Sequence, residues 1–176
     1  MHQLLLLRHA KSSSDDTAVP DRDRPLNARG RGSAAAMRRE IRELGLTPDL
    51  ILVSTAKRTM ETLAALEPWD DTPLIEPADE LYLASDTQLF MAIREIAETV
   101  RSVMIIGHNP GLHELAVALT DPGASAGPLV HTLNQGFPTM GLAEFSVVGP
   151  WSRLEAGSAW LRRFIAPKML DRADAE

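Results

Sequence analysis

The most regular feature of the sequence is a series of short, unbroken apolar runs separated by stretches with helical periodicity. The runs are bounded by polar residues and lie at 3–7 (QLLLL), 50–53 (LILV) and 103–106 (VMII). Such runs are typical of strands buried on both faces of a parallel sheet. Between and after them, apolar residues recur every three or four positions, which predicts helices over 27–44, 56–66, 85–100 and 110–119. This alternation predicts an α/β fold with three α/β/α layers, a mostly parallel central sheet and helices on both faces.

The last third of the chain has a different pattern. Residues 121–141 are rich in glycine and proline, which predicts a long irregular connection. Residues 142–148 and 158–165 then predict two strands, which we expect to form an antiparallel pair at the sheet edge. We expect residues 1–170 to form a single domain and the polar residues 171–176 to form a frayed tail. The pattern leaves open whether 121–141 closes over a site as a lid.

Composition excludes several classes of function. A chain of 176 residues suits one domain, and 24 acidic against 18 basic residues give a net charge of -6, which argues against a nucleic-acid partner. The absence of cysteine excludes a thiolate nucleophile, a disulfide framework and cysteine-based metal sites. No apolar run approaches the length of a membrane span or a secretory signal. We therefore expect a cytoplasmic protein with no membrane partner.

Basic side chains follow each of the three apolar runs. The first run ends in Arg8 and His9, the second is followed by Ser54 and Arg58, and the third is followed by His108. In an open α/β sheet the carboxyl ends of parallel strands form one edge, where ligands bind. The helices that begin there add unpaired N–H groups and a partial positive charge. Two arginines and two histidines at this edge predict a pocket for a phosphoryl group, which would also take a phosphate or sulfate anion.

Each of these residues taken alone has a structural interpretation, because a single strand-end arginine is usually in an ion pair and a single histidine is usually a hydrogen-bonding group. Their matching positions favour the functional interpretation. His9 and His108 could instead bind a metal, but two neighbouring arginines would repel the ion. We therefore expect neither a metal nor a cofactor. The other histidines lack this placement and are interpreted as structural: His2, His113 and His131.

The segment 4–12 (LLLLRHAKS) resembles the opening of the histidine phosphatase superfamily, whose motif is Arg-His-Gly, and Ala10 with Lys11 resembles its SixA-type phosphohistidine phosphatases. Other segments are similar to that subgroup in the same order: 21–30 (DRDRPLNARG), 53–62 (VSTAKRTMET), 105–111 (IIGHNPG) and 137–140 (FPTM). The alanine at position 10 departs from the glycine of the motif and bears on how closely the backbone approaches a ligand there.

The resemblance implies a metal-independent phosphatase that hydrolyses phosphohistidine on a partner protein through a covalent phosphohistidine on His9. Arg8 and Arg58 would bind phosphoryl oxygens through their forked donors, and His108 would supply a further donor. The short connections after the first two runs predict an open groove, which suits a protein substrate. A small-molecule phosphatase or phosphoglycerate mutase-like enzyme is the alternative, and a phosphoanion-binding adaptor without turnover is a third.

The proton donor is less defined than the four basic residues. The resemblance implies that the leaving oxygen is protonated by a glutamate, which follows the third strand in related phosphatases and mutases. Glu80 falls in about the right place, and Asp79 is the alternative. Both could equally be solvated loop carboxylates. We expect Asp21 and Asp23 to order their own loop. The sequence leaves the roles of Arg24 and Lys11 open.

Overall fold

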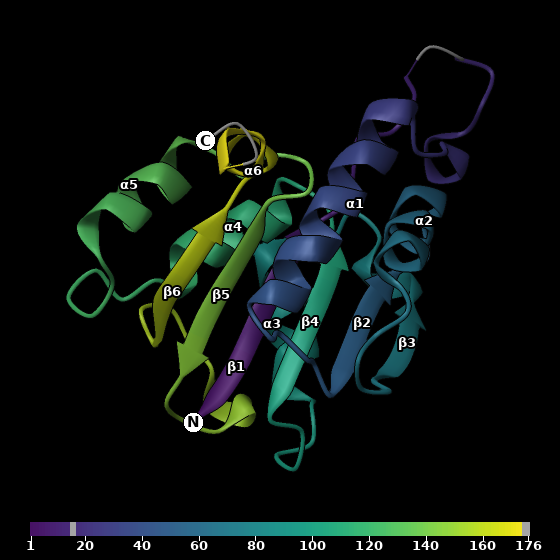
Figure 1. The fold of residues 1–176 in the computed structure, drawn as a ribbon. Helices are drawn as coiled ribbons and strands as arrows, with labels where there is room; N and C mark the ends of the chain where they lie inside the picture. Colours follow the sequence, from purple (N-terminus) through teal and green to yellow (C-terminus); the bar gives the residue numbers. More distant parts are fainter. Residues whose placement is uncertain (15–16, 174–176) are drawn as a thin grey trace.

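A six-stranded sheet forms the middle layer of the computed structural model, which describes residues 1–14 and 17–173 (Figure 1). The strands are β1 (His2–Arg8), β2 (Leu50–Ser54), β3 (Leu74–Ala78), β4 (Ser102–Gly107), β5 (Leu142–Val147) and β6 (Ala159–Ile165). The helices are α1 (Ala28–Glu43), α2 (Lys57–Leu66), α3 (Asp86–Arg94), α4 (Gly111–Leu119), α5 (Gly127–Gln135) and α6 (Pro167–Ala173). Short 3-10 turns occur at η1 (Asp21–Asp23), η2 (Asp79–Leu81) and η3 (Trp151–Arg153).

The strands are arranged in the order β3-β2-β4-β1-β5-β6. The first four are parallel to one another, whereas β5 pairs antiparallel with both β1 and β6. The predicted mostly parallel sheet with an antiparallel pair at one edge is therefore confirmed.

The four leucines of β1 explain why this run is apolar at every position. Leu4 and Leu6 belong to the core on one face of the sheet, and Leu5 and Leu7 belong to the core on the other. All four side chains are fully buried. Because successive side chains of a strand point to opposite faces, only a strand covered on both sides needs this pattern.

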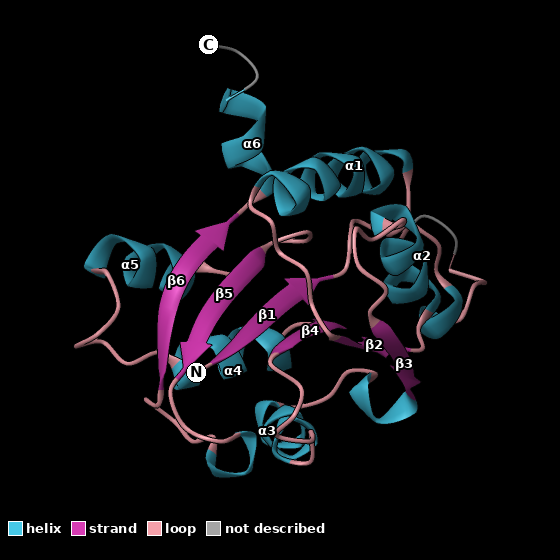
Figure 2. Cartoon of the chain, turned by 60° about the horizontal axis from the view of Figure 1, so that its bottom comes forward, coloured by secondary structure: helices cyan, strands magenta, loops and turns pink. Residues whose placement is uncertain are grey.

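Helices cover both faces of the sheet, as predicted (Figure 2). The helices α1, α2 and α6 pack over the core that contains Leu5, and α3, α4 and α5 lie over the opposite core. The start of α3 is stabilised by a capping box between Ser85 and Gln88, but the helix ends at Arg94 rather than near residue 100. No helix in the described part of the chain is long and apolar enough to cross a membrane.

Three elements were missed or misjudged in the sequence. β3 was missed because this edge strand is half exposed and has a proline at position 77, so it has no apolar run. The prediction of an irregular 121–141 segment was wrong over α5, which starts with Gly127 and Pro128 and packs against α4 and β6. α6 continues to residue 173 and so includes the first residues of the predicted frayed tail, whereas 174–176 lie outside the described residues.

The start of α1 packs directly against the backbone that follows β1. A Cβ at Gly30 would lie 2.0 Å from the carbonyl oxygen of Lys11, whereas a Cβ at Gly32 would have nothing within 4 Å. The backbone N–H of Asn27 donates to the same Lys11 oxygen at 3.0 Å. Gly30 therefore allows α1 to hold the segment after His9 in place.

This packing predicts opposite effects for two glycines on the same helix. Gly30→Ala should lower the free energy of unfolding by about 2 kcal/mol or more, because helix and backbone must separate. Gly32→Ala should raise it by about 0.5–1 kcal/mol, because alanine is the better helix former. Urea denaturation of the two variants measures both values. Equal effects would show that the close contact at Lys11 does not constrain α1.

Candidate active site

The carboxyl ends of β1, β4 and β2 bring the basic residues together. His9 follows β1, and its backbone N–H donates to the carbonyl oxygen of Gly107, the last residue of β4, at 3.1 Å. His108 follows β4 directly, so the two imidazole rings lie with their centroids 5.2 Å apart. Arg58 lies in the first turn of α2, after β2. The parallel register thus creates the predicted cluster.

The imidazole of His9 is held in one orientation. Its Nδ1 lies 2.7 Å from the carbonyl oxygen of Ala10 and must donate to it, so Nε2 carries the free lone pair. The Ala10 side chain is fully buried in the core beside α1, and the Ala10 N–H donates to Thr62 Oγ1 at 3.0 Å. The methyl group of Ala10 thus packs into the protein interior. Nε2 of His9 is the atom that can act as a nucleophile.

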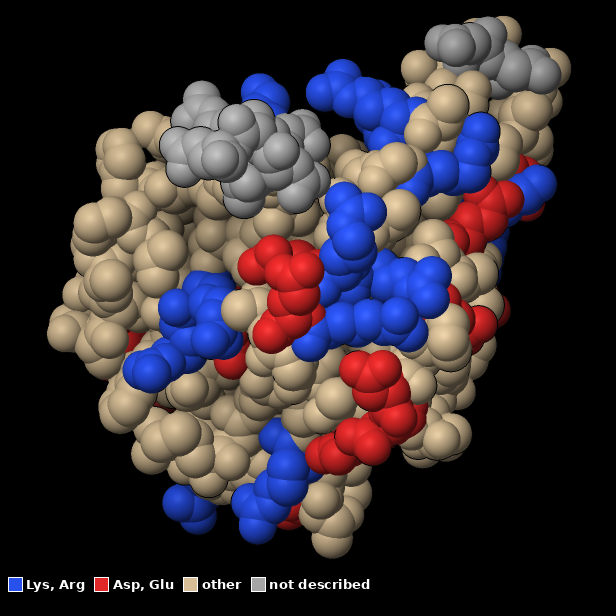
Figure 3. Space-filling view, in the orientation of Figure 1, with Lys and Arg blue, Asp and Glu red and all other residues tan. Residues whose placement is uncertain are grey.

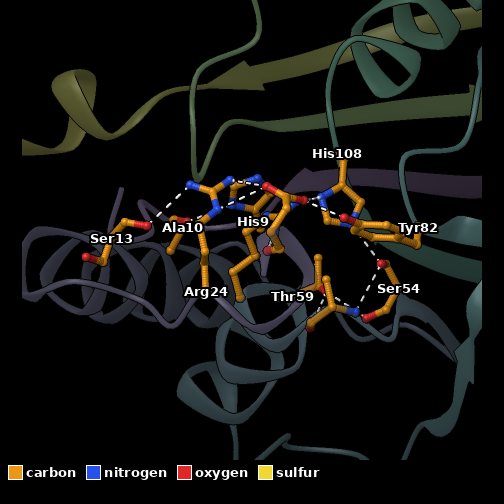
Figure 4. A network of polar contacts seen from close by, with 11 residues as sticks. His9, Ala10, Ser13, Arg24, Ser54, Thr59, Tyr82 and His108 are labelled. Atoms are coloured by element: carbon orange, nitrogen blue, oxygen red, sulfur yellow. Dashed lines mark hydrogen bonds and ion pairs between the residues drawn. The ribbon is translucent and has the colours of Figure 1, made fainter. Parts of the chain in front are cut away.

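Arg58 is 2% exposed and is held by the η1 turn. One terminal nitrogen donates to the backbone oxygen of Asp21 at 2.7 Å. The other lies 3.1 Å from Asp21 Oδ2 and 3.3 Å from Nδ1 of His108 (Figure 4). A buried guanidinium with these contacts has a defined direction, which suits recognition of a phosphoryl oxygen.

Asp21 is the centre of a polar network beside the two histidines. Its carboxylate accepts from Arg24 at 2.7 and 3.0 Å, from Arg58 and from the hydroxyl of Tyr82. These contacts, led by the Tyr82 hydrogen bond, lower the pKa of Asp21 to about 2. The Tyr82 ring also lies edge-on to His108, at 5.5 Å between centroids. Asp21 therefore stays ionised and orders the arginines around the site.

His108 is fixed from both sides. Its Nδ1 faces the guanidinium of Arg58, which can only donate, so Nδ1 accepts and the remaining proton lies on Nε2. That Nε2 is 2.7 Å from Ser54 Oγ and donates to it. Burial, followed by the charge of Arg58, lowers the pKa of His108 to about 3. Burial is also the main cause that lowers the pKa of His9 to about 4, and both rings are neutral at pH 7.

An open pocket of about 300 Å³ is lined by His9, His108 and Arg58, among others. Four cationic side chains contribute to the lining, from Arg8, Lys11, Arg24 and Arg58, and Asp21 is the one carboxylate among the described lining residues. Burial and the nearby charge of Arg58 lower the pKa of Arg8. Within 1–14 and 17–173 no three His, Asp or Glu side chains are grouped to hold a metal ion. The surplus of positive charge makes the pocket a site for an anion.

The structure does not bring Glu80 to this pocket. Glu80 is exposed and lines a separate pocket, between the apolar residues of β2 and α3, so the expectation that it protonates the leaving group has no geometric support. Asp79 is not among the described lining residues of this pocket either, and its carboxylate accepts from Thr55 and Arg22, which lower its pKa. Glu80 misses the pocket because the η2 turn carries the chain beyond the end of β3. As a result Tyr82, rather than Glu80, lies against His108.

The sequence left the roles of Arg24 and Lys11 open, and the structure shows where both side chains lie. Arg24 both pairs with Asp21 and lines the pocket, and Lys11 lines it as well. Sequence reasoning missed Asp21 and Tyr82 as site residues. The one available signal was that Asp21 belongs to the same segment as Arg24 in DRDRPL.

Comparison with known proteins agrees with this geometry. A model of the histidine phosphatase superfamily (branch 1) matches residues 4–81. The structure assigned as phosphohistidine phosphatase SixA from Agrobacterium tumefaciens is 32% identical, with a TM-score of 0.79, and the match covers 94% of this chain and 98% of that one. This chain belongs to the histidine phosphatase superfamily and is of the SixA type.

Two further relatives cover nearly the whole chain. The structure assigned as SixA from Nakamurella multipartitia is 28% identical, with a TM-score of 0.82, and covers 94% of this chain and 96% of that one. An uncharacterized protein from Mycobacterium tuberculosis is 32% identical over 162 residues, which are 92% of this chain and 100% of the relative. The similarity therefore extends well beyond the residues matched by the superfamily model.

The depressed pKa values predict the protonation of both histidines. The ring signals of His9 and His108 should stay constant from pH 7 to pH 5 and titrate only near pH 4 and pH 3. Because the unfolded chain binds protons at these rings below about pH 6.5, stability should fall as the pH drops from there toward 4. Histidine NMR titration measures the midpoints.

A charge substitution separates the two causes. Arg58→Met should raise the pKa of both rings, since the Arg58 charge contributes to lowering them, but only in part because burial is the larger cause. Arg163→Met, which removes a surface cation paired with Glu144, should leave both midpoints unchanged. Midpoints near the ordinary value of about 6.5 in the unsubstituted protein would contradict the burial of the site.

The contacts of Asp21 predict a positioning role for this residue. Asp21→Asn should lower kcat/KM for an aryl phosphate by about ten-fold or more, because Arg58 and Arg24 lose their common charged acceptor. Asp23→Asn is the matched control, since Asp23 belongs to the same turn and its side chain makes no hydrogen bond or ion pair within the described part of the chain. A rate for Asp21→Asn at or above that of the unsubstituted protein would show that Asp21 competes with the substrate instead.

Proposed function

We propose that this protein is a metal-independent phosphohistidine phosphatase that forms a covalent phosphohistidine on His9. The observation that carries the proposal is the arrangement around His9. Its Nδ1 is bonded to Ala10 O, its Nε2 is the remaining ring nitrogen, and Arg8, Arg58 and His108 line the same pocket. A neutral, oriented imidazole surrounded by cations is suited to accept a phosphoryl group.

In the first step the phosphoryl group binds to the guanidinium groups of Arg8 and Arg58. The lone pair on Nε2 of His9 attacks phosphorus, and the bond from phosphorus to the leaving group breaks. Its electron pair goes to the leaving nitrogen of the substrate imidazole, which departs neutral when that ring arrives protonated. The nearby arginines stabilise the charge on the transferring oxygens. A bound dianion favours the protonated form of His108, whose Nδ1 then donates to one of these oxygens in place of accepting from Arg58.

In the second step a water molecule attacks the phosphorus on His9. The P–N bond breaks, its electron pair returns to Nε2, and inorganic phosphate leaves with the oxygen of the water. No step requires Glu80, because the substrate imidazole leaves as a neutral ring when its other nitrogen is already protonated. An oxygen leaving group needs a proton donor, and the one carboxylate among the described lining residues, Asp21, is ionised, so the pocket favours a leaving group that needs no proton from the protein.

The openness of the site supports a protein as substrate. The catalytic pocket is small and continuous with the surface, and small substrates gain most of their affinity from enclosure. A phosphohistidine on a folded partner could reach His9 while the surrounding surface binds the partner. The SixA-type relatives support the same substrate class.

The alternative is a small-molecule phosphatase. The fold is shared by a protein assigned as alpha-ribazole-5'-P phosphatase from Escherichia coli, with a TM-score of 0.68 and 14% identity. At this identity the likeness concerns the fold alone. The two candidates differ in what surrounds the phosphoryl group, so substrate comparison separates them.

A substrate panel tests the proposal. With EDTA present, kcat/KM should be about ten-fold or more higher for a histidine-phosphorylated phosphotransfer domain than for glycerate, sugar or aryl phosphates. Rapid quench with labelled substrate should place acid-labile phosphate on His9, and His9→Ala should remove both label and turnover. Glu80→Gln should leave all rates within about two-fold. A preferred small metabolite would favour the alternative, and label on another residue would refute the mechanism.

A further inference from the structure

A second and larger hollow adjoins the catalytic pocket. This groove has a volume of about 710 Å³ and shares Arg8, Lys11, Asn109 and Thr139 with the catalytic pocket. Its walls come from the start of α1, the segment that ends α5, and the beginning of α6. A ligand that places a phosphoryl group at His9 can therefore extend into the groove without a break.

The groove is cationic, although the chain as a whole is acidic. Four basic side chains line it, from Arg8, Lys11, Arg29 and Lys168, and no Asp or Glu is among its described lining residues. Lys11, Arg29 and Lys168 are exposed, and among the side chains described in 1–14 and 17–170 no carboxylate pairs with them. In a chain with a net charge of -6, this separation of charge marks a surface for an anionic partner.

Figure 3 shows basic side chains over α1 and close to α6, toward the upper edge of the molecule in the view of Figure 1. The acidic side chains visible on this face lie lower and to the side. Basic side chains are thus present near the carboxyl ends of the strands, where the site lies, and others lie in the middle and at the lower edge of this face.

The floor of the groove is apolar, and its backbone accepts a hydrogen bond from Arg8. Phe137 and Phe164 contact each other edge to face, at 5.2 Å between centroids, and Pro138 lies beside them. The carbonyl oxygen of Phe137 accepts from Arg8 at 2.9 Å and from the Asn109 side chain at 2.8 Å. The backbone oxygen of Phe137 therefore connects the groove to the phosphoryl site. A partner bound in the groove has a defined position relative to His9.

We propose that this groove binds an acidic segment of the phosphohistidine-bearing protein, with its carboxylates against Lys11, Arg29 and Lys168. The proposal rests on the proposed function and names its substrate class more closely. A small metabolite phosphate would leave most of the 710 Å³ unfilled. The cations are also on exposed, flexible side chains around an open groove, which suits several carboxylates on an extended surface better than one enclosed anion.

The test uses two peptides that carry one histidine phosphorylated with potassium phosphoramidate. They are identical except that glutamates flank the histidine in one and serines in the other. The unsubstituted protein should prefer the glutamate peptide by about ten-fold in kcat/KM at low salt, and the preference should shrink as salt screens the exposed charges.

The diagnostic variant is Arg29→Glu combined with Lys168→Glu, since neither residue lines the catalytic pocket. It should lose the preference between the peptides and keep 4-nitrophenyl phosphate hydrolysis within about two-fold. The matched control is Arg101→Glu with Arg153→Glu, which makes the same charge change at the opposite ends of the strands, where Arg101 precedes β4. The control should keep the preference. An unchanged preference in the diagnostic variant, or an equal loss in both variants, would overturn the proposal.

A second readout does not depend on phosphohistidine turnover. The unphosphorylated glutamate peptide should inhibit 4-nitrophenyl phosphate hydrolysis by the unsubstituted protein and the control, and should do so at least about ten-fold less well for the diagnostic variant. If neither phosphorylated peptide is hydrolysed but this inhibition pattern holds, the groove proposal stands and the proposed function fails. Equal inhibition of all three proteins, or stronger inhibition by a small bisphosphate than by the peptide, would refute an acidic protein segment as the occupant.

Discussion

The alignment of three parallel strands is the constraint on which the site depends. Arg8 lies opposite Gly107 in the β1–β4 pairing, and Val53 lies opposite Ile106 in the β2–β4 pairing. The strands therefore end at one level, and the chain leaves each of them with a basic side chain close behind. A shift of one residue in the β1–β4 pairing would turn Arg8 and the chain that follows it to the other face of the sheet, so the placement of the basic residues depends on this register.

Burial then determines how these basic side chains behave. His9 and His108 are mostly buried, and they lie beside Arg58; burial first and the charge of Arg58 second lower the pKa of both rings and keep them neutral. The same burial would make the guanidinium of Arg58 costly without a partner, and Asp21 supplies the compensating charge. The site thus combines neutral imidazoles with fixed cations, which is the combination that phosphoryl transfer to histidine requires.

Under the proposed function, the surface around the site binds the protein that carries the phosphoryl group. The phosphoryl pocket has a volume of about 300 Å³, whereas the adjoining groove of about 710 Å³ offers a cationic and partly apolar surface. Phe137 connects the two, because its backbone oxygen holds Arg8 and its ring forms part of the groove. Under the proposed function, the surface that recognises the phosphoryl group and the surface that recognises its carrier are therefore contiguous but chemically distinct.

The sequence by itself determined the sheet class and the positions of Arg8, His9, Arg58 and His108, because each follows a buried strand whose apolar run is a local signal. It could not reveal β3, which is exposed and lacks that signal, or α5 within a glycine- and proline-rich segment. Only the tertiary structure decided which carboxylate enters the pocket. Asp21 and Tyr82 are 61 positions apart and meet because η1 packs against α2 while η2, just before Tyr82, packs against β2; Glu80, close in sequence to Tyr82, lines a different pocket. Such contacts depend on where two loops are carried by the core, and no local pattern of residues records that.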